Sequence, residues 1–216
     1  MTDRPSLLSV RIPPLQLAGD LRLPPAPAAV VIFAHGSGSS RLSPRNQQVA
    51  EALGAANMAT LLFDLLTEDE ARDRSNVFDI DLLSRRLADA IAWVRARSDL
   101  GGLPIGLFGA STGAAAALSA AALRPDAVSA VVSRGGRPDL AGSALEAVIA
   151  PTLLIVGGRD EPVIGLNRMA QASLAGPARL EIVPGATHLF EEPGTLEAVT
   201  DLAIAWYRQW LGGRGA

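Results

Sequence analysis

The pentapeptide Gly109-Ala110-Ser111-Thr112-Gly113 has the form G-x-S-x-G, between the apolar run Ile105–Phe108 and an alanine-rich stretch. A hydroxyl on a sharp strand-to-helix turn is pushed out of the sheet edge, where a base and a substrate can reach it. The two glycines are needed because a side chain there would collide with the neighbouring strand or helix. We therefore predict that Ser111 is a nucleophile. The alternative is a glycine-rich turn with a buried serine cap.

A serine hydroxyl needs a base, and the sequence contains two histidines, His35 and His188. His188 lies on the loop after the last predicted strand, at the same carboxyl edge of the sheet as Ser111, so we predict that it is the base. His35 also ends a strand, but a lone histidine is more often structural. We interpret His35 as structural and keep a substrate contact as its second role.

The base needs a carboxylate that fixes its tautomer. Asp160 follows a predicted strand and gives the chain order Ser111, Asp160, His188, which is the order of α/β-hydrolases. We therefore predict Asp160 as the acid. Asp139 is the second choice, and the adjacent Glu161 is expected to point elsewhere.

Acyl transfer also needs N–H donors where negative charge develops on the carbonyl oxygen. The backbone N–H of Thr112, directly after the nucleophile, is one predicted donor. The second is expected in the loop after Ala29–Ala34, with Ser37 preferred and Gly36 or Gly38 as alternatives.

Two arginines, Arg134 and Arg137, follow the predicted strand Val128–Val132 and lie near the expected substrate position. They could bind a carboxylate or phosphate of a substrate. We favour the plainer interpretation, in which they form salt bridges to the acidic stretch Glu68–Asp73 or are simply solvated.

The elements that must position these residues are short apolar runs alternating with helical patterns. Runs without polar alternation are typical of strands covered on both faces, as in a parallel sheet. The expected strands are two within Leu7–Leu23, then Ala29–Ala34, Leu61–Asp64, Ile105–Phe108, Val128–Val132, Thr152–Val156 and Leu180–Val183. The expected helices are one capped by Ser43 with Pro44 at its first position, then Asp81–Arg97, Thr112–Leu123, Pro162–Leu174 and Thr195–Leu211. This alternation predicts a three-layer α/β fold in one domain, residues 1–216, with a mostly parallel sheet.

With these pieces placed, the chain resembles an α/β-hydrolase, more narrowly the dienelactone-hydrolase-related branch. The resemblance rests on HGSGSSRLSPRN, GASTGAAAAL, VVSRGGRPDLAG, PTLLIVGGRDEPV and PGATHLFEEPG. It implies an eight-stranded sheet, the triad Ser111, Asp160 and His188, and hydrolysis of a carboxylic ester without metal or other cofactor. Similar small hydrolase domains also occur joined to phosphoribosyltransferases.

Two departures from that branch narrow the expectation. Dienelactone hydrolases proper use a cysteine nucleophile, and this chain has no cysteine, which favours serine-esterase chemistry. Many relatives insert a helical lid after the sixth strand, whereas only Ser133–Ala150 separates that strand from the next here. We therefore expect a shallow or open pocket, and not a long-chain lipase.

Composition excludes several other classes. Without cysteine, disulfides and thiolate metal sites are absent, and two histidines make a multi-histidine metal site a poor expectation. A net charge of −3 gives no reason to expect nucleic acid or an anionic membrane surface as a partner. The uncharged segment Leu100–Leu123 could span a bilayer by length, but its proline and glycines favour a buried strand–turn–helix. No signal-peptide core precedes Asp20, so we expect a cytoplasmic protein.

The sequence therefore predicts a serine hydrolase that acts on a small-molecule ester. An acyltransferase with the same triad is one alternative, since its first half-reaction is identical. A non-catalytic binding domain on a hydrolase scaffold is the other, because fold alone does not decide function.

Overall fold

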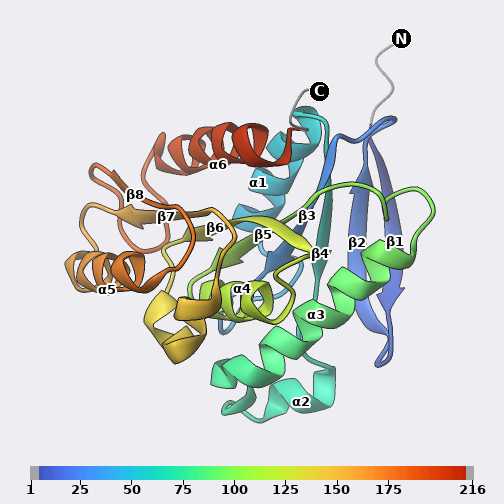
Figure 1. Cartoon of the computed structure of the whole chain (residues 1–216), viewed down its shortest axis with the longest axis horizontal. Coiled ribbons are helices and arrows are strands. Elements are labelled where there is room, and N and C mark those ends of the chain that lie inside the picture. The colour runs from blue at the N-terminus through green and yellow to red at the C-terminus, as the bar shows by residue number, and fades with distance from the viewer. Residues whose placement is uncertain (1–4, 213–216) are drawn as a thin grey trace.

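A computed structural model describes residues 5–212, and its centre is a single eight-stranded sheet (Figure 1). The strand order is β1-β2-β4-β3-β5-β6-β7-β8. Strand β2 runs antiparallel to β1 and β4, and all pairs from β4–β3 to β7–β8 are parallel, which confirms the mostly parallel sheet. The strands are β1 (Ser6–Ile12), β2 (Leu17–Leu23), β3 (Ala29–Ala34), β4 (Met58–Phe63), β5 (Ile105–Ala110), β6 (Val128–Arg134), β7 (Thr152–Gly157) and β8 (Ala178–Val183).

Helices cover both faces of the sheet, which confirms the three-layer arrangement. Figure 1 shows α1 and α6 on one face and α3 and α4 on the other. The helices are α1 (Pro44–Ala55), α2 (Glu68–Arg72), α3 (Ile80–Ala96), α4 (Thr112–Leu123), α5 (Glu161–Ser173) and α6 (Thr195–Leu211). Two 3₁₀ segments, Asn76–Phe78 and Pro138–Ala147, complete the elements.

The core consists of two apolar layers, one on each side of the sheet. Along β3, Val30 and Ile32 belong to the layer under α3 and α4, while Val31 and Phe33 belong to the layer under α1 and α6. Successive side chains of a strand point to opposite faces. A strand covered on both faces therefore reads as a continuous apolar run, which is why these runs were recognisable in the sequence.

Several element boundaries differ from the expected ones. Strand β4 begins at Met58 and not at Leu61, because the buried Thr60 interrupts the apolar run without ending the strand. The sequence prediction also missed α2, which has no buried residue and hence no apolar stripe. Its detectable signal was the capping box between Thr67 and Glu70.

The predicted start of α1 is confirmed, since the Ser43 side chain accepts a hydrogen bond from the Asn46 N–H and Pro44 is the first helical residue. Within residues 5–212, none of the helices combines the length and the apolar character that crossing a bilayer requires.

Candidate active site

Ser111 occupies the turn between β5 and α4 with φ 51° and ψ −122°, a backbone conformation that residues with a side chain rarely adopt. Three backbone hydrogen bonds hold it there. Its N–H donates to the Arg134 carbonyl at 3.2 Å, and its own carbonyl accepts from the N–H groups of Arg137 and Ala114, each at 3.1 Å. The end of β6 and the loop that follows it therefore hold the turn in place through backbone hydrogen bonds.

The glycines on either side of Ser111 have the predicted steric reason. A Cβ on Gly109 would lie 2.4 Å from the Ala114 Cα, and one on Gly113 would lie 2.3 Å from the Ala34 carbonyl oxygen. Both distances are far below van der Waals contact and both involve backbone that cannot give way. The two glycines thus let α4 start directly against the ends of β3 and β5.

His188 stands over this turn from the loop after β8. Its Nε2 lies 3.3 Å from the Ser111 Oγ, and its Nδ1 lies 2.6 Å from the Asp160 Oδ2. The Asp160 side chain is only 14% exposed, while that of His188 is 36% exposed. A carboxylate can only accept from Nδ1, so Nδ1 carries the proton and Nε2 is left free to accept from the serine hydroxyl.

The loop that carries His188 is itself anchored. The Thr187 N–H donates to the Glu192 carboxylate at 3.0 Å, and this hydrogen bond is the main cause that lowers the pKa of Glu192. Phe190 lies in the same loop with φ 56°, and its buried side chain is a second anchor for the loop. The sequence reasoning did not single out Glu192, and the adjacent Glu191 left no signal in the sequence that distinguishes the two carboxylates.

The two expected oxyanion donors lie side by side, but one is engaged. Thr112 opens α4, so its backbone N–H has no partner within the helix. The Ser37 N–H donates to the Thr112 side-chain Oγ1 at 2.9 Å. An incoming carbonyl oxygen that uses the Ser37 N–H must therefore displace the Thr112 hydroxyl or share the donor with it.

Of the triad and the two expected oxyanion donors, Ser37, Ser111 and His188 line a cavity of about 540 Å³. Its wall is made by the loop between β3 and α1, the end of β5 and the turn after β8. Besides Ser111 and His188, its polar lining includes Ser37, Arg45, Asn46 and Arg134.

Comparison with known proteins shows which family the chain belongs to. A family model described as "Alpha/beta hydrolase domain" matches residues 27–206. The chain belongs to the α/β-hydrolase domain family. It is similar to the dienelactone hydrolase of Anabaena variabilis, whose crystal structure it matches at 53% identity and TM-score 0.93, over 98% of this chain and 100% of that one. Est1E from Butyrivibrio proteoclasticus shares the fold at 16% identity and TM-score 0.78, over 94% of this chain and 98% of that one.

Curated relatives of this α/β-hydrolase domain occur in two strains of Mycobacterium tuberculosis. Both proteins have the provisional name phosphoribosyl transferase and are 60% identical over 202 residues, which is 94% of this chain and 46% of each relative. The chain thus spans about half the length of the curated relatives it matches.

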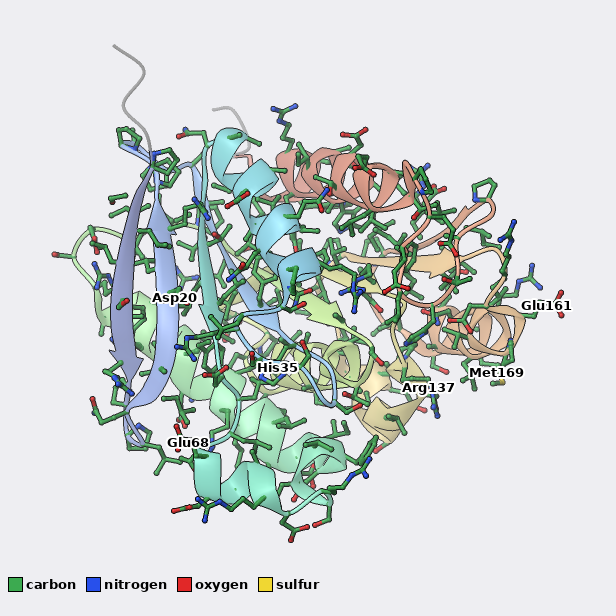
Figure 2. All side chains as sticks on the ribbon, turned by 180° about the vertical axis from the view of Figure 1, so that it is seen from behind. Asp20, His35, Glu68, Arg137, Glu161 and Met169 are labelled. Atoms are coloured by element: carbon green, nitrogen blue, oxygen red, sulfur yellow. The ribbon has the colours of Figure 1, made fainter. Side chains whose placement is uncertain are left out.

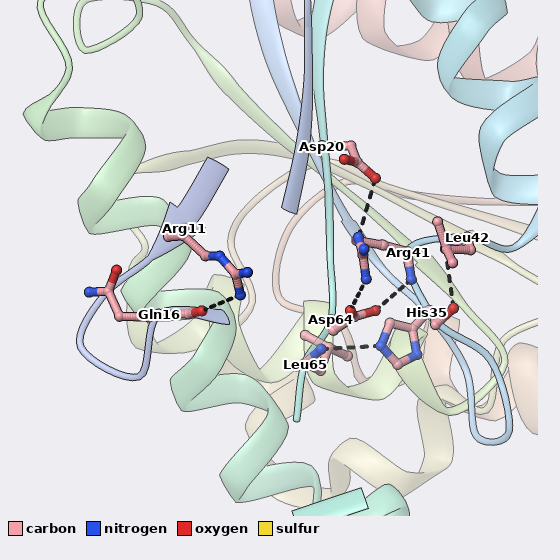
Figure 3. A network of polar contacts seen from close by, with 9 residues as sticks. Arg11, Gln16, Asp20, His35, Arg41, Leu42, Asp64 and Leu65 are labelled. Atoms are coloured by element: carbon pink, nitrogen blue, oxygen red, sulfur yellow. Dashed lines mark hydrogen bonds and ion pairs between the residues drawn. The ribbon is translucent and has the colours of Figure 1, made fainter. Parts of the chain in front are cut away.

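His35 of this α/β-hydrolase domain lies outside the cavity that Ser111 lines and borders a second cavity of about 260 Å³. Its Nε2 accepts from the Leu65 N–H at 3.1 Å (Figure 3). Its Nδ1 lies 3.0 Å from the Gly36 carbonyl. Burial lowers its pKa against the opposing effects of the Gly36 carbonyl and Asp64. Both ring nitrogens are therefore occupied by backbone groups, as suits a structural histidine.

The loop around His35 is tied down next to it. The Asp64 carboxylate accepts from the Arg41 backbone N–H at 2.9 Å and also from the Arg41 guanidinium, which reaches Asp20 at 3.3 Å (Figure 3). The segment that carries Gly36 and Ser37 is thereby fixed to the end of β4 and to β2.

Among residues 5–212, neither Arg134 nor Arg137 forms the expected salt bridge to the stretch Glu68–Asp73, and Arg134 is buried and not solvated. Arg137 forms a two-pronged salt bridge with Asp139 at 2.9 and 2.7 Å, because the two lie on one tight loop. Asp139, the second choice for the triad acid, is thereby engaged with Arg137. Figure 2 shows Arg137 and the exposed Glu161 at the surface, with Glu161 pointing away from the molecule. Arg134 is instead buried in the wall of the cavity that Ser111 and His188 line.

Proposed function

We propose that this chain is a serine hydrolase that cleaves the ester bond of a small molecule through an acyl-enzyme intermediate. The observation that carries the proposal is the continuous line of hydrogen-bonding groups from Ser111 through His188 to Asp160, at 3.3 and 2.6 Å. Membership of a hydrolase family supports the reaction class. A relative named dienelactone hydrolase supports ester-type substrates, because a lactone is a cyclic ester.

In the first half-reaction, the Ser111 oxygen forms a bond to the carbonyl carbon while its proton passes to His188 Nε2. Asp160 holds the ring in position and stabilises the imidazolium that results. The backbone N–H groups of Ser37 and Thr112 stabilise the negative oxygen of the tetrahedral adduct. The adduct then breaks the ester C–O bond, and His188 returns the proton to the departing alcohol oxygen.

In the second half-reaction, water attacks the acyl carbon. His188 takes a proton from the water and delivers it to the Ser111 oxygen as the acyl–serine bond breaks. The products are the free acid and the original enzyme, so atoms and protons balance without a cofactor. The cavity volume of about 540 Å³ suits a small ester.

The test combines labelling and turnover. A fluorophosphonate probe should label Ser111, as located by peptide mass spectrometry, and 4-nitrophenyl esters of increasing acyl length should reveal turnover with a preference for short chains. Ser111→Ala should abolish both signals while the far-UV circular dichroism spectrum is unchanged. Turnover that survives in Ser111→Ala would overturn the proposal, as would binding of small esters without labelling or turnover.

A further inference from the structure

Arg134 ends β6 directly beside the nucleophile. Its backbone carbonyl accepts the Ser111 N–H at 3.2 Å, and its side chain lines the same cavity as Ser111 and His188. The residue is only 6% exposed. A guanidinium at this depth is costly to desolvate unless acceptors surround it.

Those acceptors are almost absent. Arg134 has five N–H donors, but to the residues that the structure describes its side chain makes one hydrogen bond, from Nη2 to the Asn46 Oδ1 at 3.0 Å. Its Nε is buried without a partner, and within residues 5–212 no ion pair joins it to a carboxylate. The ring of Phe190, 6.0 Å from the guanidinium carbon, offers only a weak cation–π contact.

The charges around Arg134 make the position less favourable still. Burial and, as the smaller cause, the neighbouring cation Arg45 together lower the pKa of its guanidinium to about 10. Arg45 also lines the cavity, but its Nη1 has a carboxylate partner in Glu191 at 2.9 Å. The unbalanced charge of the cavity wall is therefore that of Arg134.

Two other arginines show how this protein satisfies a structural guanidinium. The Nε of Arg86 also lacks a hydrogen-bond partner, but this guanidinium, with a side chain 15% exposed, has a counter-charge in Glu70 at 2.7 Å. Arg95 donates to three backbone carbonyls, those of Gly101, Leu103 and Ala127, at 2.9 to 3.0 Å. Arg134 has neither arrangement, although it is the more deeply buried residue, so its open donors call for an acceptor that enters from the cavity.

We propose that Arg134 binds an anionic group, a carboxylate or a phosphate, carried by the ester that Ser111 attacks. Such a group supplies the missing counter-charge and can accept two parallel N–H bonds from the guanidinium. Asn46 keeps the guanidinium plane in place through its amide oxygen. The inference rests on the proposed hydrolase function and narrows its substrates to small anionic esters.

The test compares matched esters under one set of conditions. On the acyl side, 4-nitrophenyl hydrogen glutarate is compared with the neutral 4-nitrophenyl valerate. On the alcohol side, 3-acetoxybenzoate and 3-acetoxyphenyl phosphate are compared with neutral methyl 3-acetoxybenzoate, which also separates carboxylate from phosphate. Each kcat/KM is divided by the rate of hydroxide hydrolysis of the same ester. We expect at least one anionic ester to be preferred by about tenfold or more.

The variants assign that preference to one side chain. Arg134→Met should lower the anionic-to-neutral ratio to about one, and Arg134→Lys should restore part of it because the charge returns without the planar fork. Arg137→Met is the matched control, since Arg137 lies three residues after Arg134 but outside the cavity, and it should leave the ratio unchanged. A preference that persists in Arg134→Met, or its absence in all pairs, overturns the inference.

Two further readouts keep the result decisive. If Arg134→Met does not fold, the wild-type ratio is measured from 25 to 500 mM NaCl, where it should fall, because added ions compete for the guanidinium. A ratio that does not change with salt then overturns the inference. Hydrolysis of neutral esters, lost in Ser111→Ala, leaves the proposed function standing even when no anionic preference is found. Failure of every ester together with failure of fluorophosphonate labelling would instead overturn the function itself.

Discussion

The loops after β3 and β8 each place a histidine at the carboxyl edge of the same parallel sheet, yet the two rings have opposite surroundings. The ring of His188 faces a carboxylate on one nitrogen and a hydroxyl on the other. The ring of His35 faces a backbone N–H and a backbone carbonyl. The edge of the sheet therefore delivers both residues to a possible active position, and the groups opposite the two nitrogens decide what each ring can do.

The two histidines differ in whether Nε2 can take up a proton and release it again. At His188, Nε2 can accept a proton from Ser111 and pass it on, because a partly exposed ring beside Asp160 tolerates the positive charge. At His35, protonation of Nε2 would break the hydrogen bond from Leu65 and place a charge in a buried position. The same side chain is thus suited to proton transfer in one loop and to holding two loops together in the other.

The largest expected effect is that of His188→Gln. Removing the base should lower kcat for a short 4-nitrophenyl ester by roughly 10⁴-fold or more, since the serine then has no group to take its proton. Steady-state kinetics measure this, with the melting temperature as the folding check. A decrease in kcat of less than tenfold would show that His188 is not the base and that the two histidines do not differ in the proposed way.

Asp160→Asn should have the next largest effect. An amide in place of the carboxylate can stabilise the wrong tautomer of His188 and cannot balance the imidazolium, so kcat should fall by roughly 10³–10⁴-fold. Glu161→Gln is the matched control, because Glu161 is adjacent and exposed and points away. Equal losses in the two variants would mean that the wrong carboxylate has been assigned.

His35→Leu should affect stability more than turnover. The buried Leu65 N–H loses its acceptor, which should cost roughly 1–3 kcal/mol of the free energy of unfolding. Urea titration measures the loss, and kcat should fall far less than in His188→Gln. A loss of turnover as large as that of His188→Gln would contradict the structural role of His35.

The smallest effect concerns pH. Burial lowers the pKa of His35 from its ordinary value of 6.5, so the unfolded chain binds this proton at a higher pH than the folded protein does. The stability that the neutral ring contributes is complete above about pH 6.5 and is lost as the pH falls through the folded-state pKa. Urea titrations between pH 7.5 and 5 should show this decrease in the wild type and a flatter curve in His35→Leu. Parallel curves would show that His35 does not contribute to the decrease.

Much of the fold was predictable because burial on both faces leaves a strong mark on a sequence. The bounds of β3, α4 and α6 match the expected ranges Ala29–Ala34, Thr112–Leu123 and Thr195–Leu211. The exposed helix α2 and the 3₁₀ segment Pro138–Ala147 were missed, since neither has a long apolar pattern. The meeting of Ser111, Asp160 and His188 at one edge of the sheet was predictable, because each follows a strand and the carboxyl ends of parallel strands lie at the same edge.

The partners of individual side chains were decided only by the folded chain. Arg134 and Arg137 are close in sequence and of the same type, yet their partners differ. Arg137 pairs with Asp139, two residues away, whereas Arg134 at the end of β6 donates to Asn46 in helix α1. Likewise, nothing in the motif around Thr112 indicates that its hydroxyl engages the Ser37 N–H. The pattern of apolar residues in a sequence indicates which surfaces are buried, because burial selects the residue type at every position of a helix or strand. It does not record which polar atoms meet across the sheet edge, because those meetings depend on the relative placement of loops far apart in the chain.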